Sequence, residues 1–147
     1  MNNGHVYVEF RFCPHLLSNT IFEINGAKLG IYGEKIRSEE HVTPTDVLET
    51  VLNASKEAER LYPLIKTRFI MCALWPFTQW TQELVDYCKE YRDRGVVGLD
   101  IAGDPGQASE EEWQRVIDGF NNARDSNINI TVHAGECQGA DSCTQVD

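Results

Sequence analysis

Two residues near the end of the chain, His133 and Glu136, have the types and the spacing needed for hydrolytic chemistry. The apolar, β-branched run 128–132 predicts a buried strand that stops at His133, after which Ala-Gly leads into Glu136. Imidazole is the usual ligand of a catalytic zinc, and a nearby glutamate can transfer a proton. The alternative is a buried histidine that closes a turn, followed by a glutamate in the first turn of a helix. The motif alone leaves both interpretations open.

The elements that position this pair alternate between strands and helices. Apolar segments bounded by turn residues predict four strands, at residues 6–12, 67–74, 96–101 and 128–132. Between them, the run Thr43-Pro44-Thr45-Asp46 and the pair Ser109/Glu112 are typical helix starts, and an apolar stripe runs from Trp80 to Tyr91. The longer connection 18–42 is expected to hold a short strand pair. This order predicts a parallel sheet with crossover helices.

Polar residues inside the predicted strands favour a closed barrel over an open, doubly wound sheet. Glu9 and Arg11 share one face of the first strand, Asp100 lies in the third, and Thr131 shares a face with His133 in the fourth. The lumen of a (β/α) barrel accommodates such side chains, and no G-x-G-x-x-G sequence follows any strand. We therefore predict an α/β fold, a TIM-like (β/α) barrel of which this chain supplies about four βα units.

The active site of a barrel lies at the carboxyl ends of its strands, which adds two residues to the candidates. Gly103 either allows a ligand close to the backbone or is an ordinary turn glycine. Asp100 either orients His133 or forms an ion pair with Arg68 or Arg11 inside the barrel.

The composition limits the partners of the protein. A formal net charge of −10 over 147 residues repels phosphate, which argues against nucleic acid and anionic membranes. No apolar run reaches the roughly 18 residues of a membrane span, and no signal peptide is recognisable. Five cysteines, most of them in apolar segments, are typical of a reduced, cytoplasmic protein rather than of a disulfide framework.

Three segments together resemble the adenosine deaminase family of metal-dependent hydrolases. Val6-Tyr7-Val8-Glu9-Phe10-Arg11, with Pro14-His15-Leu16-Leu17 after it, resembles the family's second barrel strand. Gly98-Leu99-Asp100-Ile101-Ala102-Gly103-Asp104 resembles its DLAGDE strand, and Thr131-Val132-His133-Ala134-Gly135-Glu136 its TVHAGE motif. The His-Ala-Gly-Glu form is more similar to adenosine deaminase than to the adenosine-deaminase-like enzymes that act on modified AMP. The H-x-E and P-C-x-x-C signature of the cytidine-deaminase-type zinc fold is absent.

The resemblance implies a zinc hydrolase of purine metabolism that attacks C6 of adenosine or 2′-deoxyadenosine, giving inosine and ammonia. His133 would be a Zn²⁺ ligand, and the metal would activate the attacking water. Glu136 would donate a proton to N1 of the purine, and Gly103 would offer its backbone N–H to N3. Leu74 matches an apolar residue that lines the nucleoside pocket, and Asp100 would lie just behind the site.

The sequence also departs from the family pattern. The family begins with a strand carrying H-x-H, which supplies two zinc ligands, but no two of the four histidines here are separated by one residue. A later histidine and a later aspartate of the family's site have no counterpart before Asp147. We expect residues 1–147 to be a partial adenosine deaminase domain, without the H-x-H strand and the last strands, and inactive by itself. Two alternatives remain: a non-catalytic half-barrel that binds a partner, and a metal-independent α/β enzyme.

Overall fold

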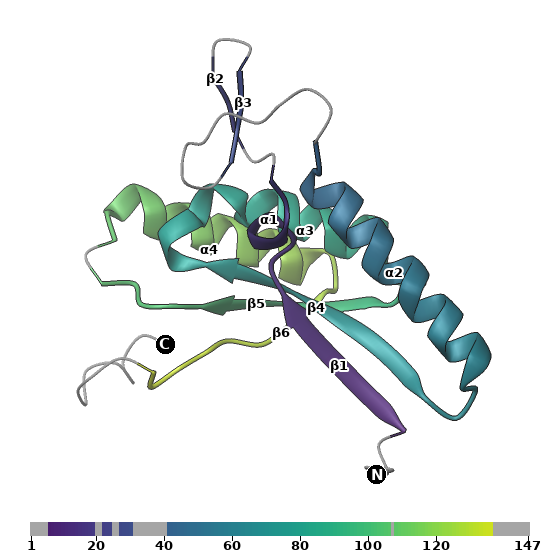
Figure 1. Cartoon of the computed structure of the whole chain (residues 1–147). Helices are drawn as coiled ribbons and strands as arrows, with labels where there is room; N and C mark the ends of the chain where they lie inside the picture. Colours follow the sequence, from purple (N-terminus) through teal and green to yellow (C-terminus); the bar gives the residue numbers. More distant parts are fainter. Residues whose placement is uncertain (1–5, 20–21, 25–26, 31–40, 107, 137–147) are drawn as a thin grey trace. The chain divides into compact units, whose positions relative to one another are not determined.

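The structure, a computed structural model, describes residues 6–19, 22–24, 27–30, 41–106 and 108–136. The chain forms two compact units, whose elements are labelled in Figure 1. One unit consists of residues 1–8 and 13–67, and the other of residues 9–12 and 68–147. All of the predicted site residues belong to the second unit. No helix in the described parts of the chain is long and apolar enough to cross a bilayer.

Most of a four-stranded sheet belongs to the second unit. Its strand order is β1-β4-β5-β6, with β1 at Tyr7–Phe12, β4 at Lys66–Leu74, β5 at Val96–Ala102 and β6 at Asn129–Ile130. β5 is parallel to β4 and to β6. The ladder continues past β6, because the N–H groups of Thr131 and His133 donate to the carbonyls of Leu99 and Ile101. The predicted parallel sheet is therefore confirmed.

The central strands β4 and β5 are buried, which explains their apolar composition. Residues 69–73 of β4 and 98–101 of β5 are all buried. A parallel strand covered on both faces needs a continuous apolar run rather than an alternating one. Asp100 interrupts the run in β5 with a charge, so its surroundings must compensate that charge.

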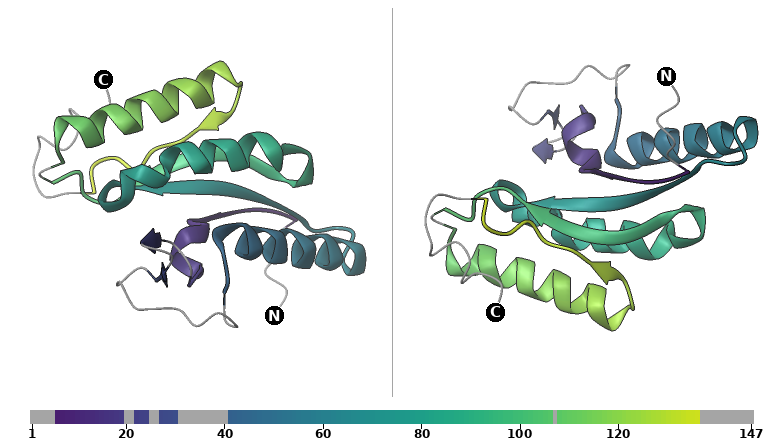
Figure 2. Two further views of the ribbon diagram at one scale, coloured as in Figure 1. Left: turned by 90° about the horizontal axis from the view of Figure 1, so that it is seen from above. Right: turned by 90° about the horizontal axis from the view of Figure 1, so that it is seen from below.

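Two helices, α3 (Thr81–Glu90) and α4 (Glu110–Asp125), lie side by side, α3 against β5 and α4 against β6 (Figure 2). α4 begins at the predicted capping box, in which Ser109 accepts from the N–H of Glu112 and Glu112 accepts from the N–H of Ser109. Two 3-10 helices, η1 (Trp75–Trp80) and η2 (Arg92–Arg94), were not predicted. Such short helices leave no periodic apolar pattern in a sequence.

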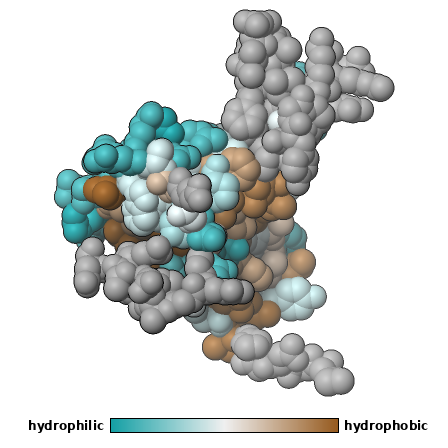
Figure 3. All heavy atoms as spheres, turned by 90° about the vertical axis from the view of Figure 1, so that its left-hand side faces the viewer, coloured by the Kyte–Doolittle hydropathy of each residue, from teal (hydrophilic) through white to brown (hydrophobic). Residues whose placement is uncertain are grey.

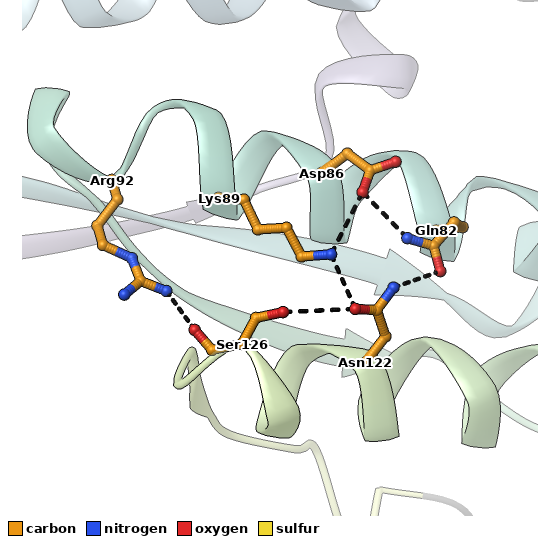
Figure 4. Close-up of polar contacts among 6 residues, drawn as sticks. All are labelled: Gln82, Asp86, Lys89, Arg92, Asn122 and Ser126. Atoms are coloured by element: carbon orange, nitrogen blue, oxygen red, sulfur yellow. Dashed lines mark hydrogen bonds and ion pairs between the residues drawn. The ribbon is translucent and has the colours of Figure 1, made fainter.

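Polar side chains join α3 to α4 (Figure 4). Asn122 of α4 is central, because its side-chain amide accepts from Lys89 Nζ at 2.8 Å and donates to Gln82 Oε1 at 3.1 Å. Near the end of α4, Arg92 donates to the backbone carbonyl of Ser126 at 2.6 Å. Each exposed hydrogen bond of this kind contributes about 1 kcal/mol or less. Together they determine which turn of α3 faces which turn of α4.

A glycine allows α3 and α4 to approach closely. Gly119 lies in the middle of α4 and is buried, and a Cβ added there would come within 2.5 Å of Thr81 Cγ2. Thr81 is only 1% exposed, so its methyl group has little room to move away.

We predict that Gly119→Ala destabilises the protein by about 1–3 kcal/mol, because overpacking outweighs the roughly 1 kcal/mol that alanine normally adds to a helix. Chemical denaturation measures the change. Thr81→Ser removes the clashing methyl group and is the matched second substitution. In the Thr81→Ser background, Gly119→Ala should cost much less. A stabilising effect of Gly119→Ala in both backgrounds would show that this close approach does not exist.

The first unit contains the predicted long helix and the predicted strand pair. Its elements are α1 (Pro14–Leu17), β2 (Phe22–Ile24), β3 (Ala27–Leu29) and α2 (Pro44–Leu61). α2 begins where its sequence predicts, since Thr43 accepts from the N–H of Asp46 and Asp46 accepts from the N–H of Thr43. β2 and β3 pair antiparallel, which confirms the strand pair expected within residues 18–42.

Glu59 joins the last turns of α2 to the start of β4. Its Oε1 accepts from the backbone N–H of Thr67 at 2.7 Å, and its Oε2 lies 3.3 Å from Lys66 Nζ. The hydrogen bond from the Thr67 N–H is the main cause that lowers the pKa of Glu59 from its ordinary 4.5, and Lys66 lowers it further.

We predict that Glu59→Gln lowers the free energy of unfolding by about 1 kcal/mol at neutral pH. Because the pKa of Glu59 is lower in the folded than in the unfolded chain, its contribution is complete above pH 4.5 and is lost as the pH falls below that value. Denaturation curves of the native protein and the variant should therefore converge in acid. Glu57→Gln, which breaks an exposed pair with Arg60, is the control with a smaller effect. A difference that stays constant with pH would contradict this role of Glu59.

Candidate active site

The sheet brings Asp100 and His133 into contact near its carboxyl end. Asp100 lies in β5, and the segment after β6 runs alongside β5, so that the His133 N–H donates to the Ile101 carbonyl at 3.0 Å. In this register His133 Nδ1 lies 2.8 Å from Asp100 Oδ2. The contact that would orient His133 is therefore present in the structure.

One oxygen of Asp100 serves several partners. Oδ2 lies 3.0 Å from Arg11 Nε of β1, and the Cys72 thiol donates to the same oxygen at 3.6 Å. The side chain is 0% exposed, and Oδ1 has no hydrogen-bond partner in the described structure. The sequence left open whether Asp100 orients His133 or forms an ion pair inside the barrel. The structure shows both the contact with His133 and the ion pair with Arg11. Because a buried carboxylate without a cation is strongly unfavourable, Arg11 compensates the charge that faces His133.

The contact with Asp100 determines the tautomer of His133. An ionised carboxylate accepts hydrogen bonds but cannot donate them, so a neutral His133 carries its proton on Nδ1. This tautomer leaves a lone pair on Nε2, the form in which imidazole binds a metal ion. The His133 side chain is 33% exposed, so Asp100 covers one end of the ring while part of the ring stays accessible.

A single imidazole does not make a zinc site. Catalytic zinc takes three protein ligands and keeps an open position. Within the described ranges, no three His, Cys, Asp or Glu side chains come together where they could hold a metal ion. The described residues alone therefore do not fit a zinc ion, and His133 would need ligands from elsewhere.

Glu136 lies on the turn that follows His133. Gly135 has φ of +72°, a left-handed conformation that glycine adopts without strain, and the chain turns there. The Glu136 side chain is exposed, and it makes no hydrogen bond to His133 in the described structure. The two residues are thus close in the chain, while the carboxylate of Glu136 lies in solvent.

The other two predicted residues lie at adjacent strand ends. Leu74, half-buried, ends β4 and is paired with Ala102, the last residue of β5. Gly103 follows with φ of +91°, and its position is exposed. Figure 3 views the molecule from the side toward which β5 points, and apolar residues lie there next to hydrophilic ones.

Sequence reasoning missed two features of this region. Cys72 lies opposite Asp100 in the β4–β5 register, which only the pairing of the strands reveals. Trp75 and Trp113 pack together with their ring centroids 4.3 Å apart. They are far apart in the chain, so no local pattern indicates that they meet.

We predict that Asp100→Asn lowers the free energy of unfolding by about 1–3 kcal/mol, because it leaves Arg11 without its carboxylate. In an Arg11→Gln background the same substitution should cost less, with a coupling energy of about 0.5–3 kcal/mol. Urea denaturation of the four proteins measures this coupling. Arg115→Gln removes an exposed partner of Glu111 and should show no coupling with Asp100→Asn. Additive costs for Arg11 and Asp100 would mean that their contact contributes nothing.

Solved structures of similar fold show the class of protein. The apo N6-methyl-AMP deaminase from Arabidopsis thaliana matches with a TM-score of 0.60 and 22% identity, over 92% of this chain and 36% of that chain. An amidohydrolase from Burkholderia ambifaria with bound Zn matches with a TM-score of 0.60 and 19% identity, over 89% of this chain and 30% of that chain. At such identities the likeness concerns the fold alone. The protein is thus an α/β protein with part of a TIM-like barrel, as predicted.

Sequence comparisons identify the family within this class. The family model described as adenosine deaminase matches residues 1–146. The adenosine deaminase of Bos taurus is 34% identical over 134 residues, which cover 91% of this chain and 34% of the bovine protein. That of Danio rerio is 35% identical over 133 residues, which cover 90% of this chain and 34% of the fish protein. The chain belongs to the adenosine deaminase family, and it spans about a third of the length of these relatives.

Proposed function

We propose that this chain forms one side of an adenosine deaminase active site, which hydrolyses adenosine or 2′-deoxyadenosine at C6 and releases ammonia. From adenosine the product is inosine. The observation that carries the proposal is the 2.8 Å contact between His133 Nδ1 and Asp100 Oδ2, because it leaves Nε2 of a strand-end histidine available. Family membership supports it, whereas nothing in the comparisons supports a non-catalytic half-barrel or a metal-independent enzyme.

In this proposal His133 would hold Zn²⁺ through Nε2 while Asp100 orients the ring. A bound zinc ion would supply an activated water, because it would lower the pKa of that water. The remaining ligands would come from outside the described residues. Within the described residues, no three His, Cys, Asp or Glu side chains come together where they could hold a metal ion. The zinc in the Burkholderia ambifaria amidohydrolase, which shares this fold, supports the choice of metal.

Three further residues are proposed to meet the purine nucleoside. The exposed Glu136 donates a proton to N1 of the purine, which makes C6 more electrophilic. Gly103 donates its backbone N–H to N3, and Leu74 at the neighbouring strand end provides apolar contact. Arabidopsis proteins of this fold have been solved in complexes with IMP and with GMP, which supports a purine ligand.

We also infer that the protein is cytoplasmic. Cys88 is a free, buried thiol, and free thiols are typical of reducing compartments. Burial raises the pKa of Cys88 to about 12, so its thiol stays protonated and unreactive at neutral pH.

We predict that Glu136→Gln in the native protein lowers kcat for adenosine by about 10²–10⁴-fold, because glutamine cannot donate the proton. Zinc content should not change, since Glu136 is not a proposed ligand. The conversion of adenosine to inosine is followed by ultraviolet absorbance. Glu110→Gln, at an exposed position at the start of α4, is the control and should retain full activity. A Glu136→Gln variant with unchanged kcat would exclude this proton donor.

We predict that the isolated 147-residue polypeptide turns over adenosine at a negligible rate and binds zinc below one equivalent, because the described residues supply one proposed ligand. Activity assays and atomic absorption measure the two quantities. An immunoblot with an antibody against residues 79–92 gives the mass of the native protein for comparison. Robust turnover by the isolated polypeptide would overturn this prediction.

A further inference from the structure

A pair of tryptophans lies beside the proposed purine site. Trp75 is the first residue of η1 and directly follows Leu74, while Trp113 lies in the first turn of α4. Both side chains are half-buried. Their ring centroids are 4.3 Å apart, and the ring planes are inclined by 58°. This is a close aromatic contact between the segment after β4 and the helix after β5.

Trp75 lies against both ends of the connection that runs from β5 to α4. At the first end, a Cβ built on Gly103 would lie 3.9 Å from Trp75 N and 3.6 Å from Pro76 Cδ. The backbone of Gly103 therefore lies beside the start of η1, with room between them for a methyl group. At the other end, the ring of Trp75 contacts the ring of Trp113.

Two hydrogen bonds join described residues within the connection between these two contacts. Asp104 Oδ1 accepts from the N–H of Gly106 at 2.8 Å, and the Pro105 carbonyl accepts from the N–H of Ala108 at 2.7 Å. The first turn of α4 is in turn closed by the capping box at Ser109. These hydrogen bonds lie between Gly103 and the start of α4.

We propose that Trp75 and Trp113 are a positioning pair that holds the Gly103 N–H in the direction needed for N3 of a purine. Gly103 has φ of +91°, and a glycine adopts many other conformations at little cost, so the packing on either side must hold it. Neither tryptophan is proposed to touch the ligand. The inference rests on the role proposed for Gly103, and it adds the residues that make recognition of N3 selective.

Two nucleosides test this selectivity in the native protein. 1-Deazaadenosine keeps N3, 1,3-dideazaadenosine lacks it, and neither has the N1 that must be protonated, so both bind without turnover. We expect the native protein to bind 1-deazaadenosine about 3- to 10-fold more tightly than 1,3-dideazaadenosine, because only the former can accept a hydrogen bond at N3. Trp113→Ala should bring the ratio of dissociation constants close to one, and Trp113→Phe should restore most of it.

Trp80→Phe is the matched control, because Trp80 stacks on Phe77 at the same centroid separation of 4.3 Å but at the far end of η1. It should leave the ratio unchanged. A Trp113→Ala variant with the native ratio would overturn the inference.

The mobility of the Gly103 N–H gives a second readout that needs neither ligand nor activity. Its NMR order parameter should fall from about 0.85 to below about 0.6 in Trp113→Ala and stay unchanged in Trp80→Phe. If neither nucleoside binds but the order parameter responds, the proposed function is wrong and the positioning pair stands. If the order parameter does not respond to Trp113→Ala, the positioning pair is refuted whatever the ligands do.

Discussion

A carboxylate withdrawn completely from solvent is the constraint on which the rest of the structure depends. Asp100 has a side chain that is 0% exposed, and an ionised carboxylate in such a place must be paired. Its partners come from opposite edges of the sheet order β1-β4-β5-β6: Arg11 from β1, and His133 from the segment after β6. Both contacts form only when every strand is in the correct register. The register that compensates the charge thus also gives His133 its orientation.

The helices of the second unit maintain this register from outside the sheet. Gly119 allows α4 to approach Thr81 at the start of α3, and Asn122 joins the two helices further along. α3 packs on β5 and α4 on β6, so the distance between the helices is coupled to the distance between Asp100 and the segment that carries His133. Packing remote from the site therefore affects its geometry, because buried elements cannot shift independently.

Local patterns in the sequence were sufficient to predict the long helices and the strands of the sheet, though not the short helices η1 and η2, because capping and periodicity depend on neighbouring residues. α2 and α4 begin at the capping boxes of Thr43 and Ser109, as predicted. The partners of Asp100 could not be decided in this way, since they depend on strand register. The Trp75–Trp113 contact was not predictable for the same reason, because it joins two separate segments. A motif can identify His133 as a candidate metal ligand. Whether other ligands lie close enough to His133 to complete a metal site depends on how distant segments fold together, which a local motif does not show.

The orientation of His133 by Asp100 is tested most directly by nitrogen-15 NMR of the His133 imidazole, at a pH where the ring is neutral. The 2.8 Å contact with Asp100 predicts that Nδ1 carries the proton and that Nε2 does not. Asp100→Asn should weaken this preference. If Nε2 carries the proton in the native protein, Asp100 does not hold the ring in a metal-binding form, and the role proposed for His133 is wrong.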